Sequence, residues 1–183
     1  MADKGGGTPR WRRAPEVRRE AILLASLPEF ETNGFEPARM DAIAEAAGLS
    51  KGSIYRYFRD KESLFTASVL FALDTALGQF SLGNSPDPDA AVRRLWQLAS
   101  DGRFTAAYRL SLANPRVGSA VPEISVRLEN GVIRPFAEFL RQSETPETLS
   151  LDDALLHARL VVATVLGAAL MRLTSPESTF TRI

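Results

Sequence analysis

The stretch from Met40 to Lys61, MDAIAEAAGLSKGSIYRYFRDK, constrains the fold more than any other part of the chain. Its first half carries apolar residues at the spacing i, i+3, i+4 and i+7, which predicts one amphipathic helix. These residues are Met40, Ile43, Ala44 and Ala47. Gly48 can then adopt the left-handed backbone that ends a helix, and Ser50 can cap the helix that follows. Two helices joined by a short, glycine-containing turn predict a helix-turn-helix, the geometry of many DNA-binding domains.

The second helix of this unit presents two different faces. Ile54 and Phe58, four residues apart, are expected to anchor its inner face. Arg56 then lies almost opposite them, with Gly52 and Ser53 beside it. Arginine can bond guanine in a bidentate manner, serine can bond a base or a phosphate, and glycine lets the backbone approach the DNA. We therefore expect this outer face to read bases in the major groove.

Other polar side chains flank this face and carry their donors on long stems, which suits phosphate contacts that fix the register without reading sequence. Asp60 is expected to cap the next helix, with Lys61 in its first turn close to the DNA backbone. Arg39, just before the first helix, can also contact a phosphate. The predicted DNA-binding residues are Arg39, Lys51, Gly52, Ser53, Tyr55, Arg56, Tyr57 and Lys61.

The segment from Phe35 to Phe65 resembles the DNA-binding domain of TetR-family transcriptional regulators. The phrase AGLSKGSIYRYFRDKESLF is a strong match to that domain. The residues that carry the resemblance are Ile43, Ala44, Ala47, Gly48, Ser50, Gly52, Tyr55, Phe58, Lys61 and Leu64. The resemblance implies a homodimer that binds a double-stranded DNA operator through paired heads. It also implies that a small-molecule effector releases the operator by entering the C-terminal domain. Beyond about Ala76 the similarity is one of architecture only.

Two positions depart from the family pattern. Arg39 stands where the family usually has a threonine that caps the helix beginning near Met40, and losing such a cap typically costs ~1 kcal/mol. Pro28 lies inside the expected first helix, where it lacks an N–H and would clash with the carbonyl of Leu24 at a cost of roughly 3 kcal/mol. We therefore expect a kink or break between Leu24 and Pro28.

The distribution of charge bears on the DNA hypothesis. The chain has 22 basic and 22 acidic residues, so its formal net charge is zero. Within residues 1–19, however, six basic residues minus two acidic ones leave a local charge of +4. DNA binding needs a local basic patch and not a basic whole chain. The N-terminal arm would supply such a patch by entering the minor groove, and the alternative is that it is a disordered leader. We assign residues 1–14 to a flexible basic arm, 15–59 to a helix-turn-helix domain and 60–183 to a helical ligand-binding and dimerisation domain.

Helical periodicity also appears outside the motif. Pro15 suits the first turn of a helix that Asn33 and Gly34 end. The residues expected to form its buried stripe are Val17, Ala21, Leu24 and Ala25. A helix that begins after Asp60 is apolar on nearly every side, so we expect it to be buried and to link the head to the body. It is also the candidate for transmitting a signal from the body to the head.

The turn-rich stretch SLGNSPDPD, residues 81–89, separates this helix from the body. Helices are predicted at 90–100 and 104–113, followed by a long bent helix from Pro122 that Gly131 and Pro135 interrupt. No strand-like alternation appears in the sequence. The predicted fold class is therefore all-α: a three-helix helix-turn-helix DNA-binding head joined by a long helix to an α-helical ligand-binding and dimerisation body.

The last predicted helix opens with Asp152 and Asp153 and contains LVVATVLGAALMRL at residues 160–173. We expect this apolar run to be too short for a membrane span. A helix that is apolar on all sides needs cover on all sides, which either a second copy or a central core position would supply. Its small residues would admit a close partner at a two-fold interface. The predicted interface residues are Val161, Ala163, Thr164, Gly167, Ala168 and Met171.

Aromatic residues of the body recur at helical spacing and can line an apolar effector pocket, although core packing is the alternative role for each of them. His157 can supply a polar anchor. The residues predicted to line this pocket are Phe71, Trp96, Phe104, Tyr108, Phe136 and His157. The chemical identity of the effector does not follow from any local motif.

Other chemistries find little support in the sequence. Cysteine is absent, which excludes disulfides and thiolate metal sites and favours a cytoplasmic location. Asp152, Asp153 and His157 are better explained by a helix N-terminus and a solvent-facing imidazole than by catalysis. The phosphate-binding, HExxH and GxSxG motifs do not occur. We expect no enzymatic activity, cofactor, metal or membrane contact. The alternative to a regulator is a helical metabolite-binding protein with a degenerate DNA-binding head.

Overall fold

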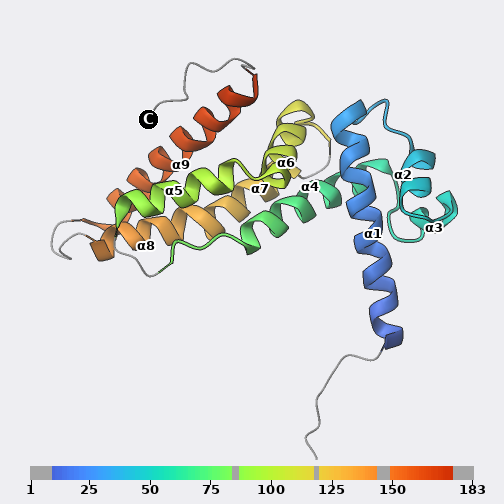
Figure 1. Ribbon diagram of the computed structural model, residues 1–183, viewed down its shortest axis with the longest axis horizontal. Helices are drawn as coiled ribbons and strands as arrows, with labels where there is room; N and C mark the ends of the chain where they lie inside the picture. Colours follow the sequence, from blue (N-terminus) through green and yellow to red (C-terminus); the bar gives the residue numbers. More distant parts are fainter. Residues whose placement is uncertain (1–9, 84–86, 118–119, 144–148, 175–183) are drawn as a thin grey trace, which may run out of the picture.

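The computed structural model describes residues 10–83, 87–117, 120–143 and 149–174. These residues form helices joined by turns and loops, and none of them lies in a strand. Figure 1 shows a small head at one end of the molecule and a longer helical body at the other. The predicted all-α class, with a helix-turn-helix head and a helical body, is confirmed.

The head consists of α1 (Arg10–Asn33), α2 (Met40–Ala46) and α3 (Lys51–Tyr55). Its centre is an aromatic cluster in which the rings of Phe30 and Phe35 both pack edge-on against Phe65 of α4, at centroid distances of 5.1 and 5.2 Å. Edge-to-face pairs of this kind stabilise a core beyond the area that they bury. The cluster therefore ties the head to the first turns of the following helix.

Helix α1 differs from the prediction in its start and in its buried face. It begins at Arg10 and not at Pro15, so residues 10–14 of the expected arm lie within the helix, while residues 1–9 lie outside the described part of the chain. The predicted stripe is wrong, because Val17 and Leu24 are 61% and 51% exposed. The residues of α1 that are fully buried are Ile22, Leu23, Ser26 and Phe30. This face packs against α2 and α4.

The expected break at Pro28 does not occur, because α1 continues without interruption through Pro28 to Asn33. Pro28 and Leu24 both lie on the exposed side of the helix. The Leu24 carbonyl, which loses its usual helical donor to the proline, therefore lies on the side of the helix that water can reach. This placement limits the cost of the missing hydrogen bond.

Helix α4 (Lys61–Gly78) links the head to the body, as predicted. Asp60 caps it, because its carboxylate accepts a 2.7 Å hydrogen bond from the backbone N–H of Ser63. The hydroxyl of Ser63 lies 3.2 Å from the Asp60 backbone N–H, which completes a capping box. Leu64, Phe65, Val69 and Leu73 are fully buried, since α1, α6 and α7 all pack against this helix. In Figure 1, α4 runs from beside α1 into the body.

The body contains α5 (Pro88–Ala99), α6 (Gly102–Ala113) and a long helical segment from Ala120 to Ser143. Near Gly131 and Pro135, where the sequence predicted an interruption, the segment contains a π-helical turn, η1 (Glu129–Ile133), between α7 (Ala120–Leu128) and α8 (Arg134–Ser143). Pro135 lacks the N–H that would bond the carbonyl of Gly131, and a π-turn accommodates such a gap. Gly131 also faces α4, since a Cβ atom there would lie 3.5 Å from Leu77 Cδ1.

The last helix, α9 (Leu151–Thr174), packs one stripe of small residues against α5 and α8. The buried members of this stripe are Ala154, Ala158, Val162, Val165 and Ala169. From Leu151 to Arg172 the helix has 22 residues and a mean hydropathy of 1.9, so it is long and apolar enough to cross a membrane. The apolar part of α9 is therefore not too short for a membrane span, contrary to the expectation from residues 160–173. A core helix of a soluble protein passes the same test but is mostly buried, whereas only 28% of the apolar part of α9 is buried inside the protein. Most of this helix is therefore left uncovered by the described residues.

Candidate nucleic-acid interface

The first helix of the motif, α2, is held by its apolar stripe. Ile43, Ala44 and Met40 are all buried, as the spacing predicted, and Ala47 is half-buried. Arg39 occupies the N-cap position and makes no side-chain cap bond, as expected. The Arg39 backbone N–H instead donates a 2.9 Å hydrogen bond to Glu29 Oε1 of α1. A carboxylate at a helix N-terminus also interacts favourably with the helix dipole, so Glu29 compensates in part for the missing threonine.

The turn between α2 and α3 has the geometry of a Schellman motif. Gly48 has φ +65°, and its N–H donates to the carbonyl of Glu45 at 3.0 Å. The N–H of Leu49 donates to the carbonyl of Ala44 at 2.9 Å. These two bonds satisfy the last carbonyls of α2 and reverse the chain within three residues. The turn that the sequence predicted from Gly48 is therefore present.

Helix α3 begins at the predicted cap. Ser50 Oγ accepts a 3.2 Å hydrogen bond from the backbone N–H of Ser53 and lies 2.9 Å from Ser53 Oγ. The helix ends at Tyr55, and Arg56 is its C-cap. Hydrogen bonds from the N–H groups of Tyr57 and Phe58 to the carbonyl of Ile54 carry the turn onward. Ser53 is thus half-buried and already bonded to the cap, which makes it a weaker candidate for base contacts than the sequence suggested.

The segment 51–58 has the buried and exposed sides that the sequence predicted, although the helix is shorter than predicted and Phe58 lies beyond its end. Ile54 and Phe58 are 0% and 4% exposed and anchor the inner face. On the outer side the structure brings together most of the predicted DNA-binding residues. The exposed ones are Lys51, Gly52, Tyr55 and Arg56, with Ser53 and Tyr57 half-buried beside them. Arg56 makes no ion pair with any residue in the described ranges, so its guanidinium is available to a base edge.

Lys51, at the start of α3, lies 2.9 Å from Asp41 Oδ2 of α2. The hydrogen bond to this carboxylate, and then its charge, raise the pKa of the Lys51 ammonium above its usual value. Lys51 therefore remains charged at neutral pH while two of its three N–H donors stay open to a phosphate. Sequence reasoning missed this role of Asp41, because the residue lies in the first turn of α2 and only the packing of α2 against α3 brings it to Lys51.

Lys61 does not join this surface. Its ammonium donates to the carbonyls of Glu36 at 2.7 Å and Ala38 at 3.4 Å, and it lies 4.7 Å from the centroid of the Phe35 ring. These contacts hold the loop between α1 and α2 against the start of α4. We conclude that Lys61 positions that loop, and that the phosphate role expected from its place in the first turn of α4 is not supported by the geometry.

The residues predicted for an effector pocket do not converge on one cavity. Phe104 is buried and stacks on Tyr108 at a centroid distance of 6.1 Å, while Phe136 is buried against Phe139. Trp96 is half-buried beneath the guanidinium of Arg172, which lies 5.3 Å from its ring centroid. Phe71 lines a different groove along α4, and His157 is exposed on α9. Most of these side chains are therefore in core or surface packing.

The residues predicted for a dimer interface lie together on α9, away from its buried stripe. Ala163, Thr164, Ala168 and Met171 are exposed, and Val161 and Gly167 are half-buried. Leu156, which the prediction omitted, and Leu160, the first residue of the predicted apolar run, extend this surface and are 54% and 57% exposed. The signal that could have revealed them is helical spacing: Leu156 lies four residues before Leu160, and Leu160 lies seven residues before Gly167.

Comparison with known proteins agrees with this geometry. Residues 22–67 match the family model described as bacterial regulatory proteins, tetR family. The transcriptional regulator AcuR of Cereibacter sphaeroides is 28% identical over 192 residues, which cover 96% of this chain and 87% of AcuR. The HTH-type transcriptional regulator RutR of Escherichia coli is 40% identical over 67 residues, which cover 37% of this chain and only 32% of RutR.

Solved structures extend the similarity to the body. Salmonella enterica GusR superposes with a TM-score of 0.66 at 26% identity, over 85% of this chain and 83% of GusR. A TetR-family regulator structure from Rhodococcus sp. superposes with a TM-score of 0.68 at 24% identity, over 90% of this chain and 91% of that one. At this identity the second likeness shows the fold alone.

Proposed function

Because the chain belongs to the TetR family of bacterial transcriptional regulators, a family of DNA-binding proteins, we propose that it is a homodimeric repressor that a small-molecule effector releases from its operator. The proposed partners are a double-stranded DNA operator, a second copy of the chain and the effector. Catalysis and cofactors form no part of the proposal. The proposed division is an arm at 1–14, a head at 15–59 and a body at 60–183. Residues 10–14 of the arm belong to the first turns of α1.

The exposed face of α3 carries this proposal. It combines a free guanidinium at Arg56, a bare backbone at Gly52 and a charged ammonium at Lys51 on one rigid turn. Such a surface can place Arg56 at a base edge while Lys51 and Tyr55 meet phosphates. The buried anchors Ile54 and Phe58 fix the orientation of this face relative to the rest of the head.

The competing hypothesis of a degenerate head rests on Arg39 and Pro28, and the structure accounts for both. Glu29 accepts the hydrogen bond of the Arg39 backbone N–H, so the N-terminus of α2 is held from α1. Pro28 lies on the exposed side of a continuous helix. Neither departure distorts the helix-turn-helix, and we therefore favour the regulator.

A dimer through α9 accounts for the apolar surface of that helix. Leu156, Leu160 and Met171 are each more than half exposed, although they belong to a helix apolar enough in composition to cross a membrane. Exposed apolar residues gathered along one face of a helix indicate an interface. A two-fold pairing of α9 would cover this face and set the two heads at a fixed separation, as a palindromic operator requires.

The first test is selection of bound duplexes from a random pool at physiological salt, followed by sequencing of the retained fraction. Enrichment of a palindrome with two half-sites is expected, because two identical heads would read the same sequence in opposite orientations. No enrichment by a folded and dimeric protein would favour the metabolite-binding hypothesis instead.

A further inference from the structure

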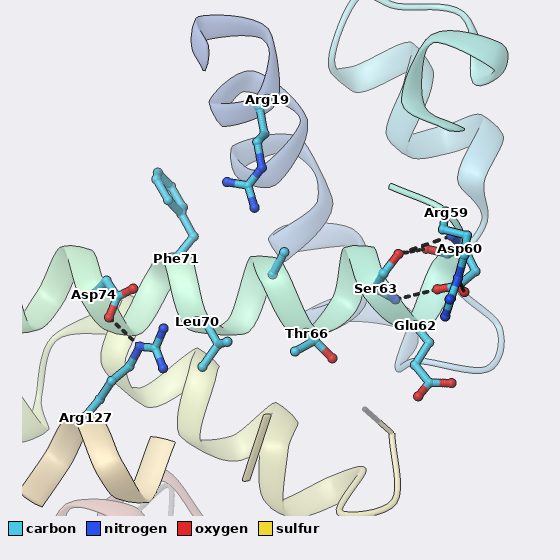
Figure 2. A pocket seen from close by; sticks show the side chains of 11 residues that line it. Arg19, Arg59, Asp60, Glu62, Ser63, Thr66, Leu70, Phe71, Asp74 and Arg127 are labelled. Carbon is cyan, nitrogen blue, oxygen red and sulfur yellow. Dashed lines mark hydrogen bonds and ion pairs between the residues drawn. The ribbon is translucent and has the colours of Figure 1, made fainter. Parts of the chain in front are cut away.

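A groove of about 440 Å³ runs along α4 where the head meets the body. We call it the junction groove. Figure 2 shows Arg19 reaching toward α4 from α1, and Arg127 approaching α4 from α7 on the other side. The groove therefore has one wall in the head and one in the body. Its volume falls within the range of small-molecule sites, roughly 300–1,000 Å³.

A second cavity, inside the body, has far less room. The cavity beside Phe104, enclosed by apolar side chains, measures about 10 Å³, which is the space of about one water molecule. A wider groove of about 710 Å³ lies between the end of α4 and α5. Both arginines there are already engaged, Arg93 with the Asp87 carboxylate and Arg94 with the Ser81 carbonyl. The junction groove is thus the better candidate for a ligand.

Arg19 is the cation in the junction groove that forms no ion pair with another residue of the described ranges. Arg59 is paired with Asp60 at 2.8 Å, and Arg127 is paired with Asp74 at 2.7 Å and with Glu123 at 3.1 Å. The guanidinium of Arg19 lies 5.3 Å from the ring centroid of Phe58 and keeps its N–H donors free. A free guanidinium of this kind recognises a carboxylate, which can accept two parallel hydrogen bonds.

The floor of the junction groove, on α4, offers both apolar and polar contacts. Ala67, Leu70 and Phe71 line it with apolar side chains. Thr66 lines it as well, and its hydroxyl oxygen is enclosed without a hydrogen-bond partner among the described residues. A buried hydroxyl that lacks a partner is unusual in a folded protein, and a ligand atom or a water would satisfy it.

We propose that the junction groove binds a small organic carboxylate. The carboxylate bonds Arg19, the apolar part of the molecule lies on Leu70 and Phe71, and a polar atom meets the hydroxyl of Thr66. Phe58 anchors the turn that follows α3, so a ligand that draws Arg19 away from Phe58 acts directly on the proposed DNA-binding surface. The effect on DNA rests on the proposed function, whereas the binding event does not.

The test is calorimetric titration of the full chain with benzoate and with hexanoate, in the absence of DNA. Saturable binding of at least one of these probes is expected, and the uncharged benzamide and hexanamide should not bind. Arg19→Gln should weaken binding about tenfold or more, because it removes a charge-assisted hydrogen bond. Arg18→Gln, a matched loss of charge at an exposed neighbour outside the groove, should leave binding unchanged. Thr66→Val, which keeps the shape of the side chain, should weaken binding to a smaller extent.

Two results would overturn the inference: no saturable binding of either probe up to millimolar concentration, or equal binding by the folded Arg19→Gln variant. Operator titration with and without the bound probe then separates the two proposals. A chain that selects an operator but binds neither probe refutes the groove site alone. A chain that binds a probe through Arg19 but selects no operator supports the groove site and contradicts the repressor.

Discussion

At the scale of single residues, we propose that the surface around α3 divides between a side chain that reads sequence and side chains that supply charge. Arg56 is exposed at the C-cap of α3, where it makes no ion pair with any described residue. Lys51 stands at the other end of the same helix with its ammonium beside Asp41. We therefore propose different tasks for the two cations: Arg56 would contact the bases and Lys51 the phosphates.

Removing the Arg56 side chain should affect specificity more than general affinity. Arg56→Ala is expected to cost ~1–3 kcal/mol of operator binding and to relax discrimination at one base pair of each half-site, because a bidentate guanine contact would be lost. The measurement is titration of the selected operator and of its single-base variants. An equal loss of affinity for every variant would show that Arg56 contacts only phosphates.

Lys51→Ala provides the matched comparison on the same helix. Loss of a phosphate contact should weaken all duplexes to a similar degree and reduce the slope of log affinity against log salt by about one per half-site. A change in base preference for Lys51→Ala would exchange the roles assigned to the two residues.

At the scale of elements, the helix-turn-helix depends on two glycines that serve different purposes. Gly48 has φ +65°, whereas Gly52 lies in α3 with ordinary helical backbone. A Cβ atom at either position would meet no atom within 4 Å. Steric clash is therefore excluded at both positions, and the difference between them is one of backbone conformation.

Alanine at these two positions should separate stability from DNA binding. Gly48→Ala is expected to destabilise the protein by about 1–2 kcal/mol, the cost of left-handed backbone for a residue with a Cβ atom. Gly52→Ala should leave stability unchanged or slightly raised, and should lower operator affinity because its methyl group holds the helix away from the DNA. Thermal unfolding and operator titration of both variants make the comparison. Loss of stability in Gly52→Ala would contradict the open surface assigned to it.

The start of α4 provides a pH-dependent contribution to stability. The hydrogen bond from the Ser63 backbone, and then the side chains of Arg59 and Ser63, lower the pKa of Asp60 from 3.8 to about 2. A lowered pKa means that the stabilisation is present above the unfolded value of 3.8 and is lost as the pH falls toward 2. The contribution of Asp60 to stability therefore changes only at strongly acidic pH, between 3.8 and about 2, and is constant near neutral pH.

Substitution of Asp60 should reveal this contribution. Asp60→Ala is expected to lower the melting temperature at neutral pH, because it removes the cap of α4. The difference in melting temperature from the unsubstituted protein should narrow as the pH falls from 3.8 to about 2, because Asp60 is protonated near 3.8 in the unfolded chain and near 2 in the folded protein. Asp60→Asn keeps a capping oxygen without the charge and should retain more of the melting temperature, with a weaker pH dependence. A constant gap at all pH values would assign the effect to packing alone.

At the scale of the whole molecule, α9 has one face that packs against the body and one face that is exposed. Its stripe of small residues packs against α5 and α8, while Leu156, Leu160 and Met171 face outward. Figure 1 shows α9 on the outside of the body, at the end away from the head. A partner on this face would join two bodies and leave both heads free to reach DNA.

A charge placed on the outward face of α9 should separate the dimer. Leu160→Asp is expected to halve the mass measured by light scattering, because a carboxylate would be buried unpaired against the second copy. Leu160 is 57% exposed in the single chain, so the fold of each protomer should survive. Val126→Asp, at a 58% exposed position of α7, is the matched control and should leave the mass unchanged. An unchanged mass for Leu160→Asp would place the interface elsewhere.

The amino-acid sequence by itself determined the local elements of the head. The apolar spacing of α2, the turn at Gly48 and the caps at Ser50 and Asp60 were all predictable. Each depends on hydrogen bonds or backbone preferences among residues a few positions apart, and such interactions persist in any tertiary context that leaves the helix intact. The two prolines inside helices show the limit of such local reasoning, because a π-turn precedes Pro135 whereas α1 continues through Pro28 without interruption.

Only the tertiary structure decided which surfaces these elements bury and which partners their polar groups find. Val17 and Leu24 follow a helical stripe as convincingly as Ile22 and Leu23, yet only the second pair faces α2 and α4. Likewise, Lys61 bonds the loop before α2 because the fold brings it into contact with Glu36 and Ala38. These residues precede Lys61 by 25 and 23 positions in the sequence. The junction groove depends on side chains from α1, α4 and α7. Burial and pairing are set by the packing of whole elements, and no short stretch of sequence contains that information.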